Sequence, residues 1–103
     1  NDSSESQIFF STTNPGYIRG QHFHMKKFER FCVIEGEAII RMRKLGSKKI
    51  TEYKVSGNDI KVFDTPVMYT HNIENIGNHK MVAIFWCSKL IKDNDIDTYW
   101  EDV

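Results

Sequence analysis

The sequence lacks net charge and long apolar runs, and each absence excludes a class of protein. Fourteen Lys and Arg residues balance fourteen Asp and Glu residues, so we expect no polyanionic partner and no nucleic acid. The longest basic run, RMRKLGSKK at residues 41–49, alternates with apolar residues, which is typical of a solvated strand and turn. No apolar stretch approaches the roughly 20 residues that cross a bilayer, so we expect no membrane contact.

Cysteine is also scarce. Cys32 and Cys87 lie far apart, each inside an apolar run, which excludes a close-spaced zinc pair or redox motif. This placement favours buried thiols in a reducing cytoplasm. The polar, acidic start NDSSESQ does not resemble a secretory signal, so we expect a cytoplasmic protein with flexible residues 1–7.

The length of 103 residues suits one domain, and the apolar pattern is that of strands. Almost no window shows helical spacing, whereas short β-type runs recur about every ten residues between polar turns. This pattern predicts an all-β sandwich or small barrel. For residues 89–103 the pattern does not choose between a short helical turn and a strand. The expected strands are residues 8–11, 18–24, 31–34, 38–43, 50–55, 60–63, a segment carrying His71, and 81–86.

Four side chains are candidate metal ligands. His22 and His24 lie two apart on one expected strand, so both project to the same face. Glu29 opens the next strand, and His71 comes from a distant one. Three imidazoles and one carboxylate suit zinc, iron, manganese, nickel or copper, and suit calcium or magnesium poorly. The alternative is that the histidines are merely polar residues in a cleft or on the surface.

Two longer patterns resemble the cupin motifs. Gly16, His22-x-His24, Glu29 and Gly36 have the spacing of the first motif, and Pro66-x-Met68-x-x-His71-x-x-x-Asn75 resembles the second. The second departs twice from the motif. Gly57 lies too far from Pro66, which implies a longer connection, and Met68 stands where a glycine with positive φ is usual. We expect Asn75 to brace a turn rather than to touch substrate.

Three longer segments point to one family among the cupins. They are GQHFHMKKFERFCVIEGEAIIRMR, YKVSGNDIKVFDTPVMYTHNIENIG and DTYW. They are similar to the carboxyl-terminal cupin domain of the CapF family of capsular polysaccharide biosynthesis proteins. The resemblance implies one cupin domain over residues 1–103, a double-stranded β-helix or jelly-roll barrel. It implies a position after a short-chain reductase domain, which agrees with a start at Asn1 rather than Met. The metal ligands it implies are His22, His24, Glu29 and His71, holding zinc.

The resemblance also implies a function. It is a metal-dependent epimerase that acts at C3 of a UDP-4-keto-6-deoxy-N-acetylhexosamine, a precursor of capsular or surface polysaccharide. The 4-keto group acidifies the C3 proton, and the enediolate formed on its removal needs charge stabilisation. NADPH would bind only in the reductase domain, outside this chain. The residues themselves offer candidates for proton transfer, which the sequence does not rank: Tyr69, Lys26, Tyr17, Tyr53 and His79.

Two other functions remain open. One is another metal-cupin enzyme, such as an iron-dependent dioxygenase with the same ligand set. The other is a non-catalytic sugar- or effector-binding cupin in which the ion is structural. By analogy with other cupins we expect a homodimer.

Overall fold

The structure, a computed structural model, describes residues 7–23, 29–87 and 99–103, and these residues form strands connected by turns. The strands are β1 (Gln7–Thr13), β2 (Ile18–Phe23), β3 (Glu29–Glu35), β4 (Glu37–Lys44), β5 (Thr51–Ser56), β6 (Val62–Thr65), β7 (Tyr69–Asn75), β8 (Met81–Cys87) and β9 (Tyr99–Trp100). Within these ranges, no helix is long and apolar enough to span a bilayer. Residues 1–7 were expected to be flexible. Residues 1–6 lie outside the described ranges, whereas Gln7 is the first residue of β1.

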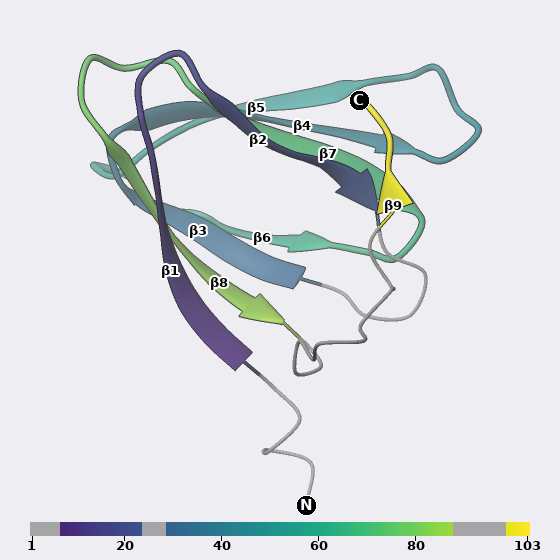
Figure 1. Cartoon of the computed structure of the whole chain (residues 1–103), viewed down its shortest axis with the longest axis horizontal. Coiled ribbons are helices and arrows are strands. Elements are labelled where there is room, and N and C mark those ends of the chain that lie inside the picture. Colours follow the sequence, from purple (N-terminus) through teal and green to yellow (C-terminus); the bar gives the residue numbers. More distant parts are fainter. Residues whose placement is uncertain (1–6, 24–28, 88–98) are drawn as a thin grey trace, which may run out of the picture.

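The strands form two antiparallel sheets that face each other (Figure 1). One sheet has the order β1-β8-β3-β6, and the other has the order β5-β4-β7-β2-β9. The chain crosses repeatedly from one sheet to the other, so residues distant in sequence meet between the sheets. The all-β prediction is confirmed, and each expected strand overlaps an observed one. The poorest match is the strand expected at residues 60–63, which shares only residues 62–63 with β6, and residue 24 of the strand expected at 18–24 lies outside the described ranges.

Alternation along each strand builds the core. On β8 the buried residues are Met81, Ala83, Phe85 and Cys87, and those between them are half-buried. Phe31 of β3 is fully buried, and its ring centroid lies 5.4 Å from that of Phe85. Burying one such aromatic side chain stabilises the fold by about 2–3 kcal/mol. The core cluster consists of Phe31, Val33, Ala38, Ile40, Met42, Val55, Ile73, Met81, Ala83 and Phe85.

Both cysteines are buried, as the sequence predicted. Cys32 and Cys87 lie on neighbouring strands, β3 and β8, but at different points along them. Burial raises the pKa of the Cys32 thiol, which keeps it neutral near physiological pH.

Asn75, at the end of β7, ties two turns together. Its side-chain amide donates to the carbonyl oxygens of Thr13 and His79, each at 2.8 Å. Its Oδ1 accepts from the Gly77 N–H at 2.9 Å. The expectation that Asn75 braces a turn is confirmed, since the β1–β2 and β7–β8 connections both depend on it.

The second motif keeps its backbone shape despite its two departures. Met68 has φ of 70°, so a methionine occupies the left-handed region where a glycine is usual. Its carbonyl oxygen accepts the Leu45 N–H at 2.8 Å, which joins this turn to the β4–β5 connection. The longer connection between Gly57 and Pro66 contains β6.

The last residues lie along β2. β9 pairs antiparallel with β2, placing Trp100 opposite His22. The Glu101 N–H donates to the Gln21 carbonyl oxygen at 2.9 Å, and the Glu101 carboxylate pairs with Arg43 at 2.6 Å. Of the two possibilities left open for the tail, residues 99–100 form a strand, and residues 88–98 lie outside the described ranges.

Candidate metal centre

Three of the expected ligands converge between the sheets. His22 comes from β2, Glu29 from β3 and His71 from β7. The Glu29 Oε1 lies 3.2 Å from the His71 Nε2 and 4.0 Å from the His22 Nε2. One potential ligand atom from each residue lies within 4.8 Å of the others. Among the residues that the structure describes, this is the one such cluster of His, Cys, Asp and Glu.

A β-bulge aims His22 at the cluster. Arg19 and Gly20 pair regularly with β7, and the register then shifts, so that His22 lies opposite His71. Gln21 is the additional residue, with φ of 61°. Regular alternation would turn Arg19 and His22, three positions apart, to opposite faces. The bulge brings both to the inner face, because one extra residue reverses the alternation.

Gly20 allows the two histidine strands to approach. Its φ is 99°, and a Cβ at this position would lie 2.7 Å from the backbone oxygen of His71. No real Cβ contact is that short, so a larger residue here would push β2 away from β7. The glycine therefore determines the distance at which His22 and His71 face each other.

Surrounding side chains hold the candidate ligands in place. Glu29 is 7% exposed and His71 is 2% exposed. The Cys87 thiol donates to the Glu29 Oε2 at 3.6 Å, leaving Oε1 toward the imidazoles. The Trp100 ring lies edge-on to the His22 ring, with centroids 5.5 Å apart. A buried carboxylate is costly unless a positive charge or hydrogen bonds compensate it, and a bound cation would do so.

The donor set fits a transition metal. Two imidazole nitrogens and one carboxylate oxygen are ligands of zinc and of other first-row metals. Around a tetrahedral ion with bonds of about 2.1 Å, ligand atoms stand about 3.4 Å apart. The Glu29 oxygen lies 3.2 Å and 4.0 Å from the two imidazole nitrogens, and all three ligand atoms lie within 4.8 Å of one another. Side-chain adjustments of about 1 Å would bring the three donors onto one ion. His24, the fourth expected ligand, lies outside the described residues.

The proton-transfer candidates occupy different places. Tyr69 begins β7, is half-buried against the core and shares a strand face with His71. Tyr17 is exposed and lines a hollow next to the ligand cavity. Tyr53 lies against Phe63, with ring centroids 5.1 Å apart. His79 is exposed in the β7–β8 turn, and Lys26 lies outside the described residues. A role in proton transfer stays a prediction for each.

Three residues near the ligands were not predicted from sequence. These are Arg19, Cys87 and Trp100. Gly20, an isolated glycine inside an expected strand, was a signal for the bulge that places Arg19 on the inner face. No local signal marks Cys87 or Trp100, because both reach the site through pairing with distant strands.

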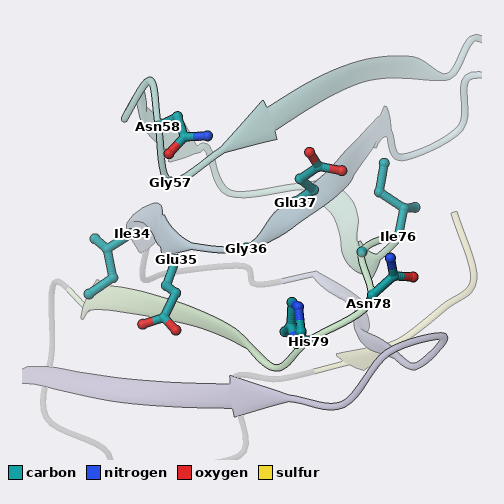
Figure 2. Close-up of a pocket in the computed structure, with 10 residues that line it drawn as sticks. Ile34, Glu35, Gly36, Glu37, Gly57, Asn58, Ile76, Asn78 and His79 are labelled. Atoms are coloured by element: carbon teal, nitrogen blue, oxygen red, sulfur yellow. The ribbon is translucent and has the colours of Figure 1, made fainter.

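The ligands line a small cavity of about 30 Å³, with room for an ion and about one water. Its lining residues are Phe9, Arg19, Gly20, His22, Glu29, His71, Ile73 and Phe85. A larger hollow of about 400 Å³ lies at the β3–β4, β5–β6 and β7–β8 turns (Figure 2). There the Glu35 and Glu37 side chains point away from each other, so they do not form a second centre.

Two facing antiparallel sheets with histidines and a carboxylate converging between them define a cupin with a candidate metal centre. Residues 1–99 match the Polysaccharide biosynthesis C-terminal domain family, and the chain belongs to this family.

Two relatives resemble the chain along nearly its whole length. It is 32% identical over 97 residues to the UDP-2-acetamido-2,6-beta-L-arabino-hexul-4-ose reductase of Pseudomonas aeruginosa, an alignment of 94% of this chain and 26% of the relative. It is 41% identical to the capsular polysaccharide assembling protein CapF of Staphylococcus aureus, with a TM-score of 0.93, over 97% of this chain and 29% of that chain. The chain thus spans about a quarter of the length of these relatives.

A more distant structure shares the fold. This is the dTDP-6-deoxy-D-glucose-3,5-epimerase RmlC of Legionella pneumophila, solved with dTDP-4-keto-L-rhamnose. It superposes with a TM-score of 0.71 at 20% identity, over 84% of this chain and 49% of that chain. The likeness supports the cupin fold predicted from sequence.

Proposed function

We propose that the chain is a metal-dependent epimerase domain acting at C3 of a UDP-4-keto-6-deoxy-N-acetylhexosamine in capsular or surface polysaccharide precursor biosynthesis. The observation that carries the proposal is the convergence of His22, Glu29 and His71 inside a cupin. The relatives support the substrate class, since one is named as a UDP-hexulose reductase and another as a capsular polysaccharide protein. The chain would follow a reductase domain that binds NADPH.

The reaction needs a base, a site for negative charge and a proton source. Removal of the C3 proton leaves an enediolate across C3 and C4, and return of a proton to the opposite face gives the epimer. A divalent ion, when bound, supplies Lewis-acid stabilisation of the negative oxygen. His22, His24, Glu29 and His71 would hold that ion, and zinc suits this donor set.

Tyr69 is our first candidate for the proton transfer. It lies two residues before His71 on the same face of β7, and it is half-buried rather than fully solvated. A general acid or base must come within hydrogen-bond distance of the reacting carbon's proton, and two residues on one face of a strand lie about 7 Å apart along it. Tyr17 and Lys26 are the other candidates.

Hydrogen exchange tests the proposal directly. The metal-loaded protein is incubated in D₂O with UDP-2-acetamido-2,6-dideoxy-hexos-4-ulose, and deuterium at C3 is followed by NMR. We expect label at C3 with the wild type and none with His22→Ala. An unlabelled C3 in the wild type would contradict an epimerase and favour a non-catalytic sugar-binding cupin.

Metal analysis separates the remaining alternative. A dioxygenase requires a redox-active ion such as iron, whereas C3 epimerisation does not. Exchange supported by zinc alone, under argon, would exclude an oxygen-dependent reaction as the main activity. Exchange only with iron and oxygen would contradict the proposed function.

We also propose that the protein is a homodimer. β1 is an edge strand, and its outward residues Ile8 and Phe10 are exposed, Phe10 at 68%. Val62 of β6 is exposed on the other edge of the same sheet. Apolar side chains on an outer sheet face favour burial against a second copy. Light scattering should give twice the 12.1 kDa chain mass, and Phe10→Asp should reduce it to the monomer value.

A further inference from the structure

Arg19 differs from the other arginines of the chain. Arg30 pairs with Asp64 at 2.6 Å, Arg41 with Glu52 and Glu74 at 2.8 Å, and Arg43 with Glu101 at 2.6 Å. Among the described residues, Arg19 has no carboxylate within ion-pair distance. Its Cζ instead lies 5.4 Å from the centroid of the Phe85 ring. The ring positions the guanidinium without neutralising it.

Arg19 lies between two hollows. It lines the cavity of His22, Glu29 and His71, and it also lines an adjoining hollow of about 300 Å³. The residues lining the second hollow are Thr12, Thr13, Asn14, Tyr17, Ile18, Arg19 and Lys80. Two of these described lining residues are cations and none is acidic. The described lining of the hollow therefore carries two positive charges and no negative one, and Arg19 is the residue that it shares with the cavity of His22, Glu29 and His71.

Thr13 adds a polar group to this hollow. The residue is 7% exposed, and its Oγ1 has no hydrogen-bond partner within the described part of the chain. A buried hydroxyl without a partner carries a desolvation cost. This oxygen has almost no accessible surface, so a bound phosphate would remove that cost only if the Thr13 side chain turned toward the hollow. Phosphate oxygens are strong acceptors, and a guanidinium binds them in a bidentate manner.

We propose that Arg19 and Lys80 bind the phosphates of a nucleotide sugar in this hollow. The inference rests on the proposed function for the identity of the sugar. In a nucleotide sugar the phosphate is bonded to the anomeric carbon, and the reacting sugar must lie against the ion, outside the small cavity that would hold it. A phosphate site must therefore lie close to that cavity, and Arg19 meets this condition because it lines both the cavity and the hollow. The exposed Tyr17 ring offers an apolar face to the rest of the nucleotide.

The affinity for UDP tests the proposed phosphate site independently of the epimerase reaction. Isothermal titration with the purified protein compares the wild type with Arg19→Gln, Arg19→Lys and Lys80→Gln. We expect Arg19→Gln to weaken UDP binding about tenfold or more, and Lys80→Gln about three- to tenfold. Arg19→Lys should retain part of the affinity, because it keeps the charge and loses the bidentate geometry.

Lys54→Gln is the matched control. Lys54 is exposed on β5, away from both hollows, so its variant should bind UDP within about twofold of the wild type. Circular dichroism melting of each variant separates lost binding from lost folding. Uridine should bind more weakly than UDP and should not distinguish Arg19→Gln from the wild type, since it lacks the phosphates.

Several outcomes would overturn the site. The first is that the wild type binds no UDP at millimolar concentration. The second is that a folded Arg19→Gln variant binds UDP with wild-type affinity. The third is that inorganic phosphate binds as tightly as UDP. The first two show that Arg19 does not hold a nucleotide, and the third shows a general anion site. UDP lacks the keto sugar, so its binding does not depend on the epimerase reaction. UDP binding through Arg19 together with no deuterium exchange in the keto sugar would therefore contradict the epimerase and leave the phosphate site standing.

Discussion

The His71 Nε2 lies 3.2 Å from the Glu29 Oε1, although 42 positions separate the two residues in the chain. Glu29 belongs to the sheet with the order β1-β8-β3-β6 and His71 to the other sheet. The contact therefore exists only when the two sheets close on each other. An ion bound to both residues would link the sheets and stabilise the folded chain, because ligands that bind only the native state raise its stability.

This linkage predicts a metal-dependent melting temperature. Zinc at about one hundred times its Kd contributes about 2.7 kcal/mol, which corresponds to a rise of about 10 °C or more for a domain of this size. In His22→Ala the rise should be largely lost. His79→Ala is the control, because His79 is exposed in a turn and only its backbone oxygen bonds to Asn75. Differential scanning calorimetry with zinc and with chelator measures the shift, and an equal rise in His22→Ala would refute the ligand assignment.

Gly20→Ala should damage both the fold and the site. The new Cβ would lie 2.7 Å from the His71 oxygen, so β2 and β7 must separate. We expect a loss of about 2–4 kcal/mol in the free energy of unfolding by urea, together with weaker zinc binding. Gly46→Ala shares the positive φ but meets nothing within 4 Å, so it should cost only about 1 kcal/mol. Equal costs for the two variants would show that the close approach is not what requires glycine.

Met68→Gly should stabilise the protein. Met68 has φ of 70°, a conformation that costs a side-chain-bearing residue about 1–2 kcal/mol. The greater freedom of glycine in the unfolded chain offsets part of this gain, leaving about 0.5–1 kcal/mol. Urea unfolding measures the difference. A destabilised variant would mean that contacts of the methionine side chain outweigh its backbone strain.

We expect Cys87 to raise the affinity for the metal by orienting the Glu29 carboxylate. Its thiol donates to Oε2 at 3.6 Å, which orients the carboxylate toward the imidazoles. Loss of such an outer hydrogen bond lowers metal affinity about 10- to 100-fold, so Cys87→Ala should raise the zinc Kd by about this factor. Cys87→Ser keeps a donor and should restore most of the affinity. Cys32→Ala, a buried thiol away from the ligands, controls for packing, and a similar effect on zinc binding in that variant would argue against the positioning role.

Much of the fold could be predicted because strand alternation and turn residues are local properties of the sequence. The apolar run at residues 81–86 marked β8, and the asparagine and glycine residues around 75–79 marked the turn before it. The side-chain role of Asn75 was also predictable, since asparagine commonly bonds to nearby backbone groups.

The details of the site depend on pairing that no local pattern encodes. Alternation alone would turn Arg19 and His22 to opposite faces, and only the bulge at Gln21 brings both inward. Cys87 reaches Glu29 because β8 pairs with β3 in one register. At Met68 the local sequence was misleading. A methionine argues against a positive φ, but the structure has φ of 70° there, in a turn where the Met68 carbonyl oxygen accepts the Leu45 N–H.

The metal content of the purified chain shows whether His22, Glu29 and His71 share one ion. The protein is stripped with chelator, reconstituted with zinc, desalted and analysed by inductively coupled plasma mass spectrometry. We expect one zinc ion for each wild-type chain, little zinc in His22→Ala and His71→Ala, and a wild-type content in His79→Ala. A wild type that holds no metal after reconstitution, or a folded His22→Ala variant with full zinc content, would contradict a shared metal site.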